Sequence, residues 1–357
     1  MPCSDIMAHV PEFVSAAFAS DNAAPAHPSA LEALIAANEG SAPSYGSDPI
    51  TQRAATRIRE VFESPDADVL FAFTGTGANI IALAAAVRPW QEILCSGIAH
   101  ALLDEAGGPV RVSGATLTPL PSDDGIIDPA QLDRRITRRG DVHHSQPRIV
   151  SITQSTENGR VWQPDTIAAF VDHARELDLL VHVDGSRIAN AIAALGVTPA
   201  QAIGDADIVT VGGTKNGMLF GDAILVRRPA HFGGIDFVQK QIGHLASKHR
   251  YVSAQFDALL RDGDWLTAAA HANAMAARLS AGMTRLGLRL SSPTEANEVF
   301  ANLAPQILAA VRQRFAVHVP DSHRPAVRFV CSWATTADEV DQALEIVRRV
   351  VSVRQRR

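Results

Sequence analysis

The chain has 357 residues, of which 46% are hydrophobic and 20% are charged, and its formal net charge at pH 7 is -6. This length allows more than one hydrophobic core, and the negative charge argues against nucleic acid or an anionic membrane as the main partner. Three widely spaced cysteines, Cys3, Cys95 and Cys331, form neither a disulfide framework nor a zinc pattern, so we expect no metal and a reducing cytoplasm. No apolar run reaches the roughly 18 residues that a membrane span requires.

The N-terminal part of the chain predicts helices separated by polar turns. Residues 1–19 give little signal and are interpreted as an arm, and turn-forming residues follow at 20–25. Helices are predicted at residues 30–37 and 50–63. The second of these is amphipathic, with its apolar residues on one side and its arginines largely on the other.

Short apolar runs rich in valine and isoleucine predict seven buried strands, with helices between most of them. The strands are expected at residues 69–73, 93–95, 116–120, 148–153, 180–183, 208–211 and 223–226. The helices are expected at residues 78–87, 100–107, 128–138, 164–178 and 188–195. This alternation predicts an α/β domain with a mainly parallel sheet covered on both faces, in which ligands bind at the carboxyl ends of the strands.

The remaining sequence predicts a smaller α+β part. Residues 239–286 have a helical pattern, strands are expected at 298–303 and 327–331, and a last helix is expected at 337–351. We therefore divide the chain into an N-terminal arm (1–19), a large domain (20–260) and a small C-terminal domain (261–357).

The glycine-rich turn between the last two strands of the large domain carries Lys215. A lysine between two interior strands is either a surface charge or an amine with little water around it. Desolvation would lower the pKa of such an amine and favour its attack on carbonyl groups. The flanking glycines favour this second interpretation, because they allow a ligand to approach the backbone closely.

Three other features follow predicted strands. Residues 74–79, TGTGAN, form a turn that leads into a helix, whose N-terminal N–H groups can bind a phosphate. Taken alone, this turn is better explained by a steric need for glycine. His100 follows the strand at 93–95, and Asp184 ends the strand at 180–183, where a carboxylate is costly without a cationic or hydrogen-bonding partner.

A phosphate-binding turn, an aspartate that ends a strand and a lysine one strand later together fit pyridoxal 5'-phosphate. The turn would bind the phosphate, Asp184 would hold the pyridinium N–H, and Lys215 would form a Schiff base with the aldehyde. His100 could stack on the ring. A nicotinamide cofactor is disfavoured, because the turn does not contain the G-x-G-x-x-G pattern.

Eight motifs in order along the chain resemble the low-specificity L-threonine aldolases, within the β-eliminating-lyase group of fold-type I pyridoxal-phosphate enzymes. They are SDNAAPAHP at 20, APSYGSDP at 42, FAFTGTGAN at 71, AHALLDEAGG at 99, HVDGSRIANA at 182, VGGTKNGM at 211, KQIGHLASKHR at 240 and VRFVCSW at 327. The resemblance implies a cytoplasmic lyase that cleaves L-threonine, L-allo-threonine and related β-hydroxy-α-amino acids to glycine and an aldehyde. It also implies a homo-oligomer, commonly a dimer of dimers, with shared active sites.

The resemblance also implies roles for residues that bind the cofactor. It assigns the phosphate to Gly75, Thr76 and Gly77, and the Schiff base to Lys215. Arg187 would contact the oxygen of the cofactor ring or the substrate carboxylate. The pairing of Asp184 with the ring nitrogen and the stacking of His100 agree with the interpretation from the residues alone.

Further residues are implied on the substrate side. Ser20 and Arg328 would hold the substrate carboxylate, for which the planar guanidinium of Arg328 is suited. Tyr45, as a substrate-binding residue, and Lys240, as a cofactor-binding residue, match positions that reach the site of a neighbouring subunit. The general base that takes the proton of the β-hydroxyl is expected to be His100, or a water held by His100 and Glu105.

The chain departs from many relatives at two positions. Thr74 replaces a serine, which keeps the hydroxyl, and Glu157 replaces a histidine that is associated with the β-hydroxyl. The sequence KNGM after position 214 resembles bacterial members that accept bulky substrates such as phenylserine. The alternatives are β-elimination or transamination of an amino acid, and a non-catalytic protein that keeps the fold, which the joint presence of Lys215, Asp184 and His100 disfavours.

Overall fold

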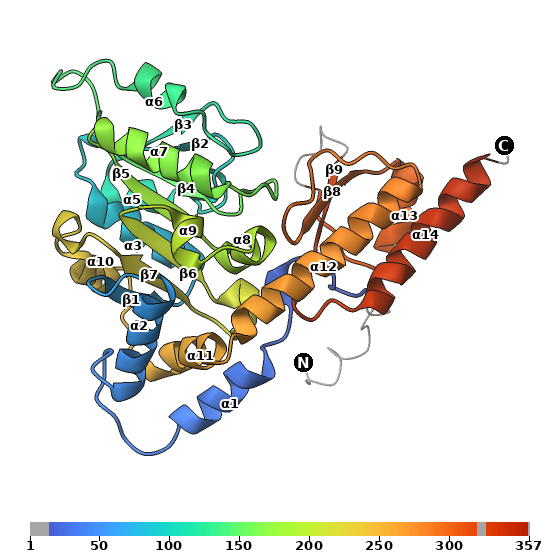
Figure 1. Cartoon of the computed structure of the whole chain (residues 1–357), viewed down its shortest axis with the longest axis horizontal. Coiled ribbons are helices and arrows are strands. Elements are labelled where there is room, and N and C mark those ends of the chain that lie inside the picture. The colour runs from blue at the N-terminus through green and yellow to red at the C-terminus, as the bar shows by residue number, and fades with distance from the viewer. Residues whose placement is uncertain (1–13, 320–325, 356–357) are drawn as a thin grey trace, which may run out of the picture. The chain divides into compact units, whose positions relative to one another are not determined.

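The protein is described by a computed structural model that covers residues 14–319 and 326–355 (Figure 1). Its described residues divide into two compact units. The first is Pro25–Ala270, and the second contains the described residues up to Ala24 together with those from His271 onward. Residues 14–24, part of which we interpreted as an arm, therefore group with the C-terminal residues. The first half of the expected arm, 1–13, lies outside the described residues.

The first unit contains a seven-stranded sheet in the order β1-β7-β6-β5-β4-β2-β3. β7 is antiparallel to both of its neighbours, and the other pairs are parallel. The strands are β1 (Asp68–Ala72), β2 (Gln91–Ser96), β3 (Thr116–Leu120), β4 (Gln146–Thr153), β5 (Leu180–Gly185), β6 (Ile208–Gly212) and β7 (Asp222–Val226). All seven predicted strands are confirmed, and so is the mostly parallel sheet.

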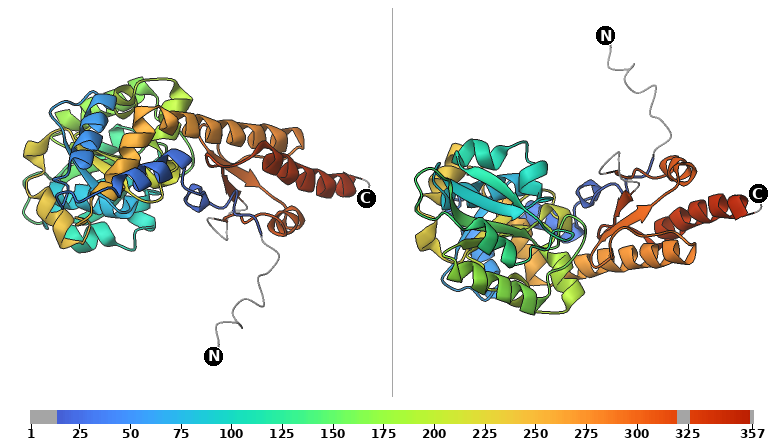
Figure 2. Two further views of the ribbon diagram at one scale, coloured as in Figure 1. Left: turned by 90° about the horizontal axis from the view of Figure 1, so that it is seen from below. Right: turned by 90° about the horizontal axis from the view of Figure 1, so that it is seen from above.

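Helices cover both faces of this sheet (Figures 1 and 2). Neighbouring residues of one strand belong to different cores: Val181 and Val183 face one hydrophobic cluster, and Leu180 faces the other. Burial on both faces explains why the strands are continuous apolar runs without alternation. The helices of this unit are α1 (Pro28–Ala37), α2 (Pro49–Val61), α3 (Gly75–Ala86), α4 (His100–Leu103), α5 (Gly108–Ser113), α6 (Ala130–Arg135), α7 (Pro164–Glu176), α8 (Ile188–Leu195), α9 (Pro199–Ile203), α10 (Ile235–Gln241) and α11 (Arg250–Arg261), with short 3-10 turns η3 (Thr214–Asn216) and η4 (Pro229–His231).

Two predicted helices are interrupted in the structure. The helix expected at 100–107 ends early, with α4 at Leu103, and Ala106 and Gly107, with positive φ angles of 49° and 71°, separate it from α5, which was not expected. The helical stretch expected at 239–286 forms three helices, α10, α11 and α12 (Asp264–Arg285). Gly243 and Gly263, with φ angles of 81° and 76°, lie between them. Glycine adopts this left-handed conformation without steric cost, which ends each helix.

The second unit has its own core around a two-stranded antiparallel sheet. Its elements are η2 (Asp21–Ala23), β8 (Glu298–Asn302), α13 (Pro305–Arg312), β9 (Ala326–Val330) and α14 (Ala337–Gln355). Phe18 is fully buried there, with its ring centroid 5.0 Å from that of Phe315 and 5.9 Å from that of Phe329. This burial is the physical reason why residues 14–24 are part of the unit. In the described part of the chain, no helix is long and apolar enough to cross a bilayer.

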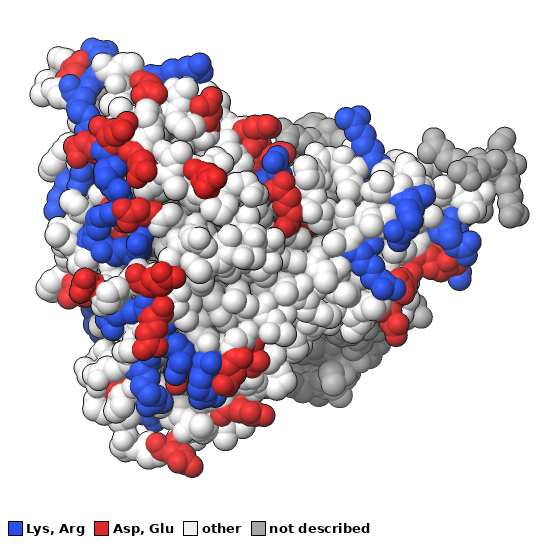
Figure 3. Space-filling view, in the orientation of Figure 1, with Lys and Arg blue, Asp and Glu red and all other residues white. Residues whose placement is uncertain are grey.

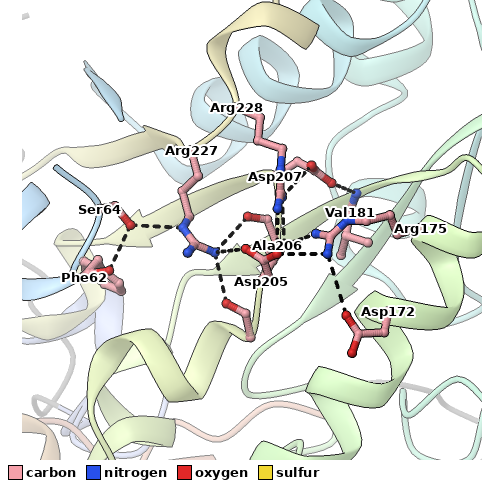
Figure 4. A network of polar contacts seen from close by, with 11 residues as sticks. Phe62, Ser64, Asp172, Arg175, Val181, Asp205, Ala206, Asp207, Arg227 and Arg228 are labelled. Atoms are coloured by element: carbon pink, nitrogen blue, oxygen red, sulfur yellow. Dashed lines mark hydrogen bonds and ion pairs between the residues drawn. The ribbon is translucent and has the colours of Figure 1, made fainter. Parts of the chain in front are cut away.

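Charged side chains of the two signs lie beside one another on the surface shown in Figure 3. A network of charged residues that includes Asp205, Asp207 and Arg228 joins the amino ends of β5 and β6 to the end of β7 (Figure 4). Asp207 accepts hydrogen bonds from the backbone N of Val181 at 2.7 Å and from Arg228 at 2.8 Å, and Asp205 accepts from Arg228 at 2.6 Å. Because this group lies at the amino ends of the parallel strands, opposite to the edge where ligands bind, we interpret it as structural.

Replacing Asp207 with alanine should destabilise the fold without changing the chemistry of the site. Asp207 is buried, so its removal leaves the Val181 N–H without an acceptor and takes away one of the two carboxylates that bind Arg228. Hydrogen bonds that involve a charged group contribute about 1.5–3 kcal/mol, so we expect a loss of about that size. Denaturant unfolding followed by circular dichroism measures it, with the exposed Asp236→Ala as the control. An equal stability of Asp207→Ala and wild type would contradict the structural role.

Candidate active site

Three neighbouring strands bring the candidate site residues to one edge of the sheet. Thr153 at the end of β4 pairs with Asp184 at the end of β5, and Asp184 pairs with Thr210 in β6. Lys215 follows β6 in η3. The carboxyl ends of parallel strands are where ligands bind in this class of sheet. The structure therefore brings Asp184 and Lys215 to the predicted edge.

Asp184 is a buried carboxylate that accepts three hydrogen bonds. Its Oδ2 accepts from Asn79 Nδ2 at 2.8 Å, and its Oδ1 accepts from the backbone N and the hydroxyl of Ser186 at 3.0 and 2.7 Å. Burial raises the pKa of Asp184, but the positive charge of Lys215, the neighbouring His182 and the Ser186 hydrogen bonds outweigh it and hold the pKa below its ordinary value. The protein thus keeps a negative charge inside the site.

His100 and Glu105 form a hydrogen-bonded pair. His100 Nδ1 lies 2.9 Å from Glu105 Oε1. This hydrogen bond raises the pKa of His100, and burial raises the pKa of Glu105, so the pair holds one proton tightly between them. The His100 side chain is 38% exposed, whereas that of Glu105 is 0% exposed. His100 can therefore contact a bound molecule, and Glu105 acts through it.

Glu157 is hydrogen-bonded to the backbone of His100. Its Oε1 accepts from the backbone N of His100 at 2.9 Å and from Thr153 Oγ1 at 2.8 Å. Its Oε2 is inaccessible to solvent and has no hydrogen-bond partner among the described residues. Burial raises the pKa of Glu157 to about 7. Because Oε2 is buried, the Glu157 carboxylate does not face a ligand. Its bond to the His100 backbone holds the first residue of α4 in place.

The raised pKa of Glu157 gives a pH-dependent prediction. The ordinary pKa is 4.5 and the folded pKa is about 7, so the folded state binds more protons between these values and loses stability as pH rises through that window. Glu157→Gln, which keeps an acceptor for both hydrogen bonds, should therefore gain about 1–3 kcal/mol relative to wild type between pH 5 and pH 8.

Thermal unfolding at pH 5 and pH 8 tests this, with the exposed Glu60→Gln as the matched control. The difference in Tm between Glu157→Gln and wild type should increase with pH, and that of Glu60→Gln should not. A constant difference for Glu157→Gln would mean that this carboxyl titrates normally.

The glycine-rich turn forms the N-terminus of α3. Thr74 Oγ1 accepts from Gly77 N at 3.0 Å and Thr74 O accepts from Ala78 N at 3.0 Å. The N–H groups of Gly75 and Thr76 come before these, in the first turn, where no intrahelical acceptor exists. They remain the candidates for a phosphate, and Gly77 is a weaker one because Thr74 occupies its N–H.

Close packing also requires both glycines of this turn. A Cβ atom at Gly75 would lie 2.8 Å from Asp222 Oδ2, and one at Gly77 would lie 2.0 Å from the ring of His244. His244 is fixed there by its Nδ1, which accepts from Phe73 N at 3.1 Å. The steric interpretation of the turn is therefore correct for both glycines, and it is compatible with a phosphate at the free N–H groups.

The turn that carries Lys215 is held from both sides. Asp222 Oδ1 accepts from the backbone N of Gly213 at 3.0 Å and of Thr214 at 3.2 Å, and Asn216 Nδ2 donates to Trp265 O at 2.7 Å. Lys215 is half-buried and makes no hydrogen bond or ion pair within the described residues. Its charge nevertheless lowers the pKa of Asp184, so the amine lies in the field of that carboxylate.

The predicted substrate-binding residues are distributed over both units. Arg187 is half-buried and begins α8, three residues after Asp184. Ser20 caps η2 by accepting from Asn22 N at 3.2 Å, and Arg328 in β9 lies 3.8 Å from Glu298; both belong to the second unit. The contact of Ser20 and Arg328 with a substrate carboxylate stays a prediction.

Tyr45 and Lys240 lie together in the first unit. The Lys240 amine is 4.7 Å from the centre of the Tyr45 ring, a cation–π contact. Tyr45 is half-exposed, and its backbone N donates to Ser247 O at 3.0 Å. These two residues share one surface, and their reach toward a neighbouring subunit stays a prediction.

Several residues of the site were not predicted as members of it. Asn79 bridges Asp184 and Glu105, Asp222 fixes the Lys215 turn, and His244 covers Gly77. Asn79 had a readable signal, because it is the one polar side chain inside an otherwise apolar helical run. Asp222 and His244 had no such signal, since their roles depend on contacts between distant segments.

Residues 17–306 match the family model described as beta-eliminating lyase. The chain belongs to the beta-eliminating lyase family. A low specificity L-threonine aldolase from a Pseudomonas species is 41% identical over 94% of this chain and 98% of that protein. A solved threonine aldolase from Leishmania major has 29% identity and a TM-score of 0.90, over 94% of this chain and 100% of that one.

Structures of more distant proteins show the fold alone. An aspartate aminotransferase from Thermus thermophilus is 16% identical and has a TM-score of 0.71, over 94% of this chain and 91% of that one. The chain thus has the fold-type I architecture, as predicted. The described residues contain no group of three or more His, Cys, Asp or Glu that could hold a metal.

This site of a beta-eliminating lyase family member fits pyridoxal 5'-phosphate, which is its cofactor. An ionised, buried Asp184 suits a ring N–H, and the Lys215 amine is free for a bond to the aldehyde. The free N–H groups of Gly75 and Thr76 suit the phosphate. His100 offers a partly exposed ring for stacking. Together these residues provide a partner for the ring nitrogen, the aldehyde, the phosphate and the ring face of pyridoxal 5'-phosphate.

Proposed function

We propose that the protein catalyses the retro-aldol cleavage of L-threonine, L-allo-threonine and related β-hydroxy-α-amino acids to glycine and an aldehyde. The observation that carries this proposal is the buried Asp184 carboxylate in the field of Lys215, next to the His100–Glu105 pair. The similarity to the threonine aldolases of Pseudomonas and Leishmania over nearly the whole chain supports the same reaction.

The site residues divide the chemistry between them. When bound, the cofactor takes up the electron pair that the broken Cα–Cβ bond leaves on Cα. Asp184 keeps the proton on the ring nitrogen, and this role requires its lowered pKa. Lys215 holds the cofactor covalently between turnovers. The turn at Gly75 and Thr76 anchors the phosphate so that the ring stays in register with these two side chains.

We assign the removal of the β-hydroxyl proton to His100, directly or through a water held with Glu105. His100 is hydrogen-bonded to the buried Glu105 through Nδ1, so Nε2 is the nitrogen that can face a substrate. A general base of this kind contributes roughly 10²- to 10⁴-fold to the rate. His100 must be neutral to act, so the rate should rise with pH through its raised pKa.

Substrate recognition is assigned to two arginines and a serine. Arg187, Ser20 and Arg328 would bind the carboxylate, with the guanidinium groups as bidentate donors. Glu157 would affect the preference between threo and erythro substrates through its hold on the His100 backbone. The KNGM sequence that starts at Lys215 supports acceptance of bulky substrates such as phenylserine.

The protein is proposed to work as a cytoplasmic homo-oligomer, a dimer of dimers in which Tyr45 and Lys240 reach the site of the neighbouring subunit. Their position on one surface, with Tyr45 half-exposed, supports this arrangement.

The test of the function is a product assay on the purified protein with L-threonine. Retro-aldol cleavage releases acetaldehyde and glycine, whereas β-elimination releases 2-oxobutyrate and ammonia. Transamination would require a keto acid in a second half-reaction. We expect acetaldehyde and glycine in equal amounts. Release of 2-oxobutyrate with ammonia would establish the alternative, and no product from any β-hydroxy amino acid would point to the non-catalytic alternative.

A further inference from the structure

Asn79 is a buried amide between two carboxylates. Its Nδ2 lies 2.8 Å from Asp184 Oδ2 and 2.8 Å from Glu105 Oε1. Its Oδ1 accepts from Thr210 Oγ1 at 3.1 Å. The residue is 1% exposed, so water does not compete for these bonds. Each of the two amide hydrogens therefore goes to a different carboxylate.

The orientation of this amide is fixed by its partners. In the opposite orientation, Oδ1 would face two carboxylate oxygens, and neither carboxylate would receive a hydrogen from Asn79. Carboxylates accept and do not donate when ionised, so only the observed orientation satisfies all three partners. Asn79 is consequently a double donor at a point where two negative groups approach each other.

Two ionised carboxylates in a low-dielectric interior repel each other, and without donors one of them would take up a proton. A hydrogen bond to the charged form favours that form. Asn79 supplies one such bond to Asp184 and one to Glu105, and bonds to ionised acceptors are the stronger kind. The Asn79 amide thus offsets the electrostatic repulsion between the ionised Asp184 and Glu105 carboxylates.

The same bonds determine which nitrogen of His100 carries the hydrogen. Glu105 Oε1 accepts from Asn79, and it also lies 2.9 Å from His100 Nδ1. An ionised Glu105 can only accept at this oxygen, so His100 Nδ1 donates to it. In the neutral ring, Nε2 then has no hydrogen and is an acceptor.

We propose that Asn79 is a positioning residue whose two amide hydrogens keep Asp184 and Glu105 side by side as acceptors, and so leave His100 with its hydrogen on Nδ1 and a free acceptor at Nε2. Asn79 would link the carboxylate that holds the cofactor ring to the residue that takes the substrate proton. The part that concerns the proton rests on the proposed function, and the part that concerns the cofactor does not.

Two substitutions test this proposal. Asn79→Asp keeps the shape but replaces both amide hydrogens with a carboxylate oxygen, and Asn79→Ala removes both hydrogens without adding an acid. Asn38→Asp is the matched control, because Asn38 is an exposed asparagine at the end of α1 that also accepts a hydrogen bond, from Tyr251 at 2.6 Å. Circular dichroism and the thermal unfolding curve identify any variant that fails to fold.

The first readout is the dissociation constant of pyridoxal 5'-phosphate, followed through its visible absorbance. Loss of the donor raises the pKa of Asp184 and weakens its hold on the ring nitrogen, so we expect the constant to rise roughly tenfold or more in both variants. The control should keep the wild-type value. This measurement needs no substrate.

The second readout is the pH profile of kcat/KM for L-threonine. The groups that face His100 are Glu105, Asp184, Lys215 and, at the backbone, Glu157. Loss of a donor to Glu105 increases the proton affinity of the His100–Glu105 pair, so the acid-side limb should move to higher pH, by about one unit. A residue that only fills space would lower the rate without moving this limb.

The outcomes separate the two proposals. Wild-type dissociation constants and an unmoved acid-side limb in both Asn79 variants would overturn the role of Asn79. If the wild-type protein releases no glycine from threonine, the proposed function fails, and the dissociation constants still decide whether Asn79 supports Asp184. A shift in both readouts, absent from Asn38→Asp, is the result that the structure leads us to expect.

Discussion

Lys215→Ala should lose both the visible absorbance of the bound cofactor and the release of glycine from threonine. The amine is the only group on the Lys215 turn that can bond covalently to the aldehyde, and it makes no hydrogen bond or ion pair within the described residues that would hold it elsewhere. In Lys215→Ala, any amine that reacts with the aldehyde must come from solution and is not held beside it. We therefore expect the rate of glycine release to fall by more than roughly 10³-fold. Absorbance spectra and a coupled aldehyde assay measure the two effects.

The control for this substitution is Lys248→Ala. The sequence contains three lysines, Lys215, Lys240 and Lys248, and Lys248 is exposed. Lys248→Ala should keep the absorbance band. Because Lys215 lies on a turn held by Asp222 and Asn216, the alanine variant should also keep its unfolding temperature. An unchanged band in folded Lys215→Ala would remove this residue from the mechanism.

Asp184→Asn should produce the second large loss, with the cofactor still attached. The amide has the shape of the carboxylate and lacks its charge, so the ring nitrogen is no longer held in its protonated form. Removing one member of a buried charge pair costs about 3–5 kcal/mol, which corresponds to a fall of roughly 10²- to 10⁴-fold in kcat/KM. Steady-state kinetics with L-threonine measure the loss, and the visible spectrum shows that Lys215 is still occupied.

Asp184→Glu provides the comparison, because it keeps the charge and changes the geometry. The fall in kcat/KM should be smaller for Asp184→Glu than for Asp184→Asn if the charge matters, and larger if only the shape matters. The buried surroundings of Asp184 in β5, with Asn79 and Ser186 as donors, leave little room for the longer side chain. Equal activity of Asp184→Asn and wild type would exclude an electrostatic role.

Most of the fold of the large unit could be predicted from the sequence, because its strands are buried on both faces. Runs such as 180–183 and 208–211 have few other interpretations, and the structure extends each by only one or two residues. The early end of the helix expected at 100–107 was not predicted, because the break after α4 includes Ala106, which has a positive φ and no turn signature in the sequence. α13 was missed, since its eight residues are too few for a clear period.

In the small unit, contacts between distant parts of the chain limit what the sequence can predict. The sequence places Phe18 in an N-terminal arm, and in the structure it is fully buried and packs against Phe315 and Phe329. Nothing near Phe18 in the sequence indicates this, because its partners lie about three hundred residues away. Residue 18 of the expected arm is therefore joined to the C-terminal core by packing that only a three-dimensional structure can reveal.

The site was predictable where a residue type carries the chemistry by itself. Lys215 and Asp184 follow strands, and a strand end fixes where a side chain lies to within a few residues. Asp222 and His244 act through contacts between distant segments, so their type and spacing gave no comparable signal, whereas Asn79 was visible only as the one polar side chain in an apolar helical run. Glu157 was noticed as a departure, and the structure shows where it binds, at the His100 backbone.

One measurement tests the central claim most directly: reduction of the purified protein with borohydride in the presence of the cofactor, followed by peptide mass spectrometry. Because the chain has three lysines, the attached mass can lie on only three peptides. The account predicts that the mass is found on the peptide that contains Lys215, at one cofactor per chain. Attachment at Lys240 or Lys248, or no attachment at all, would contradict it.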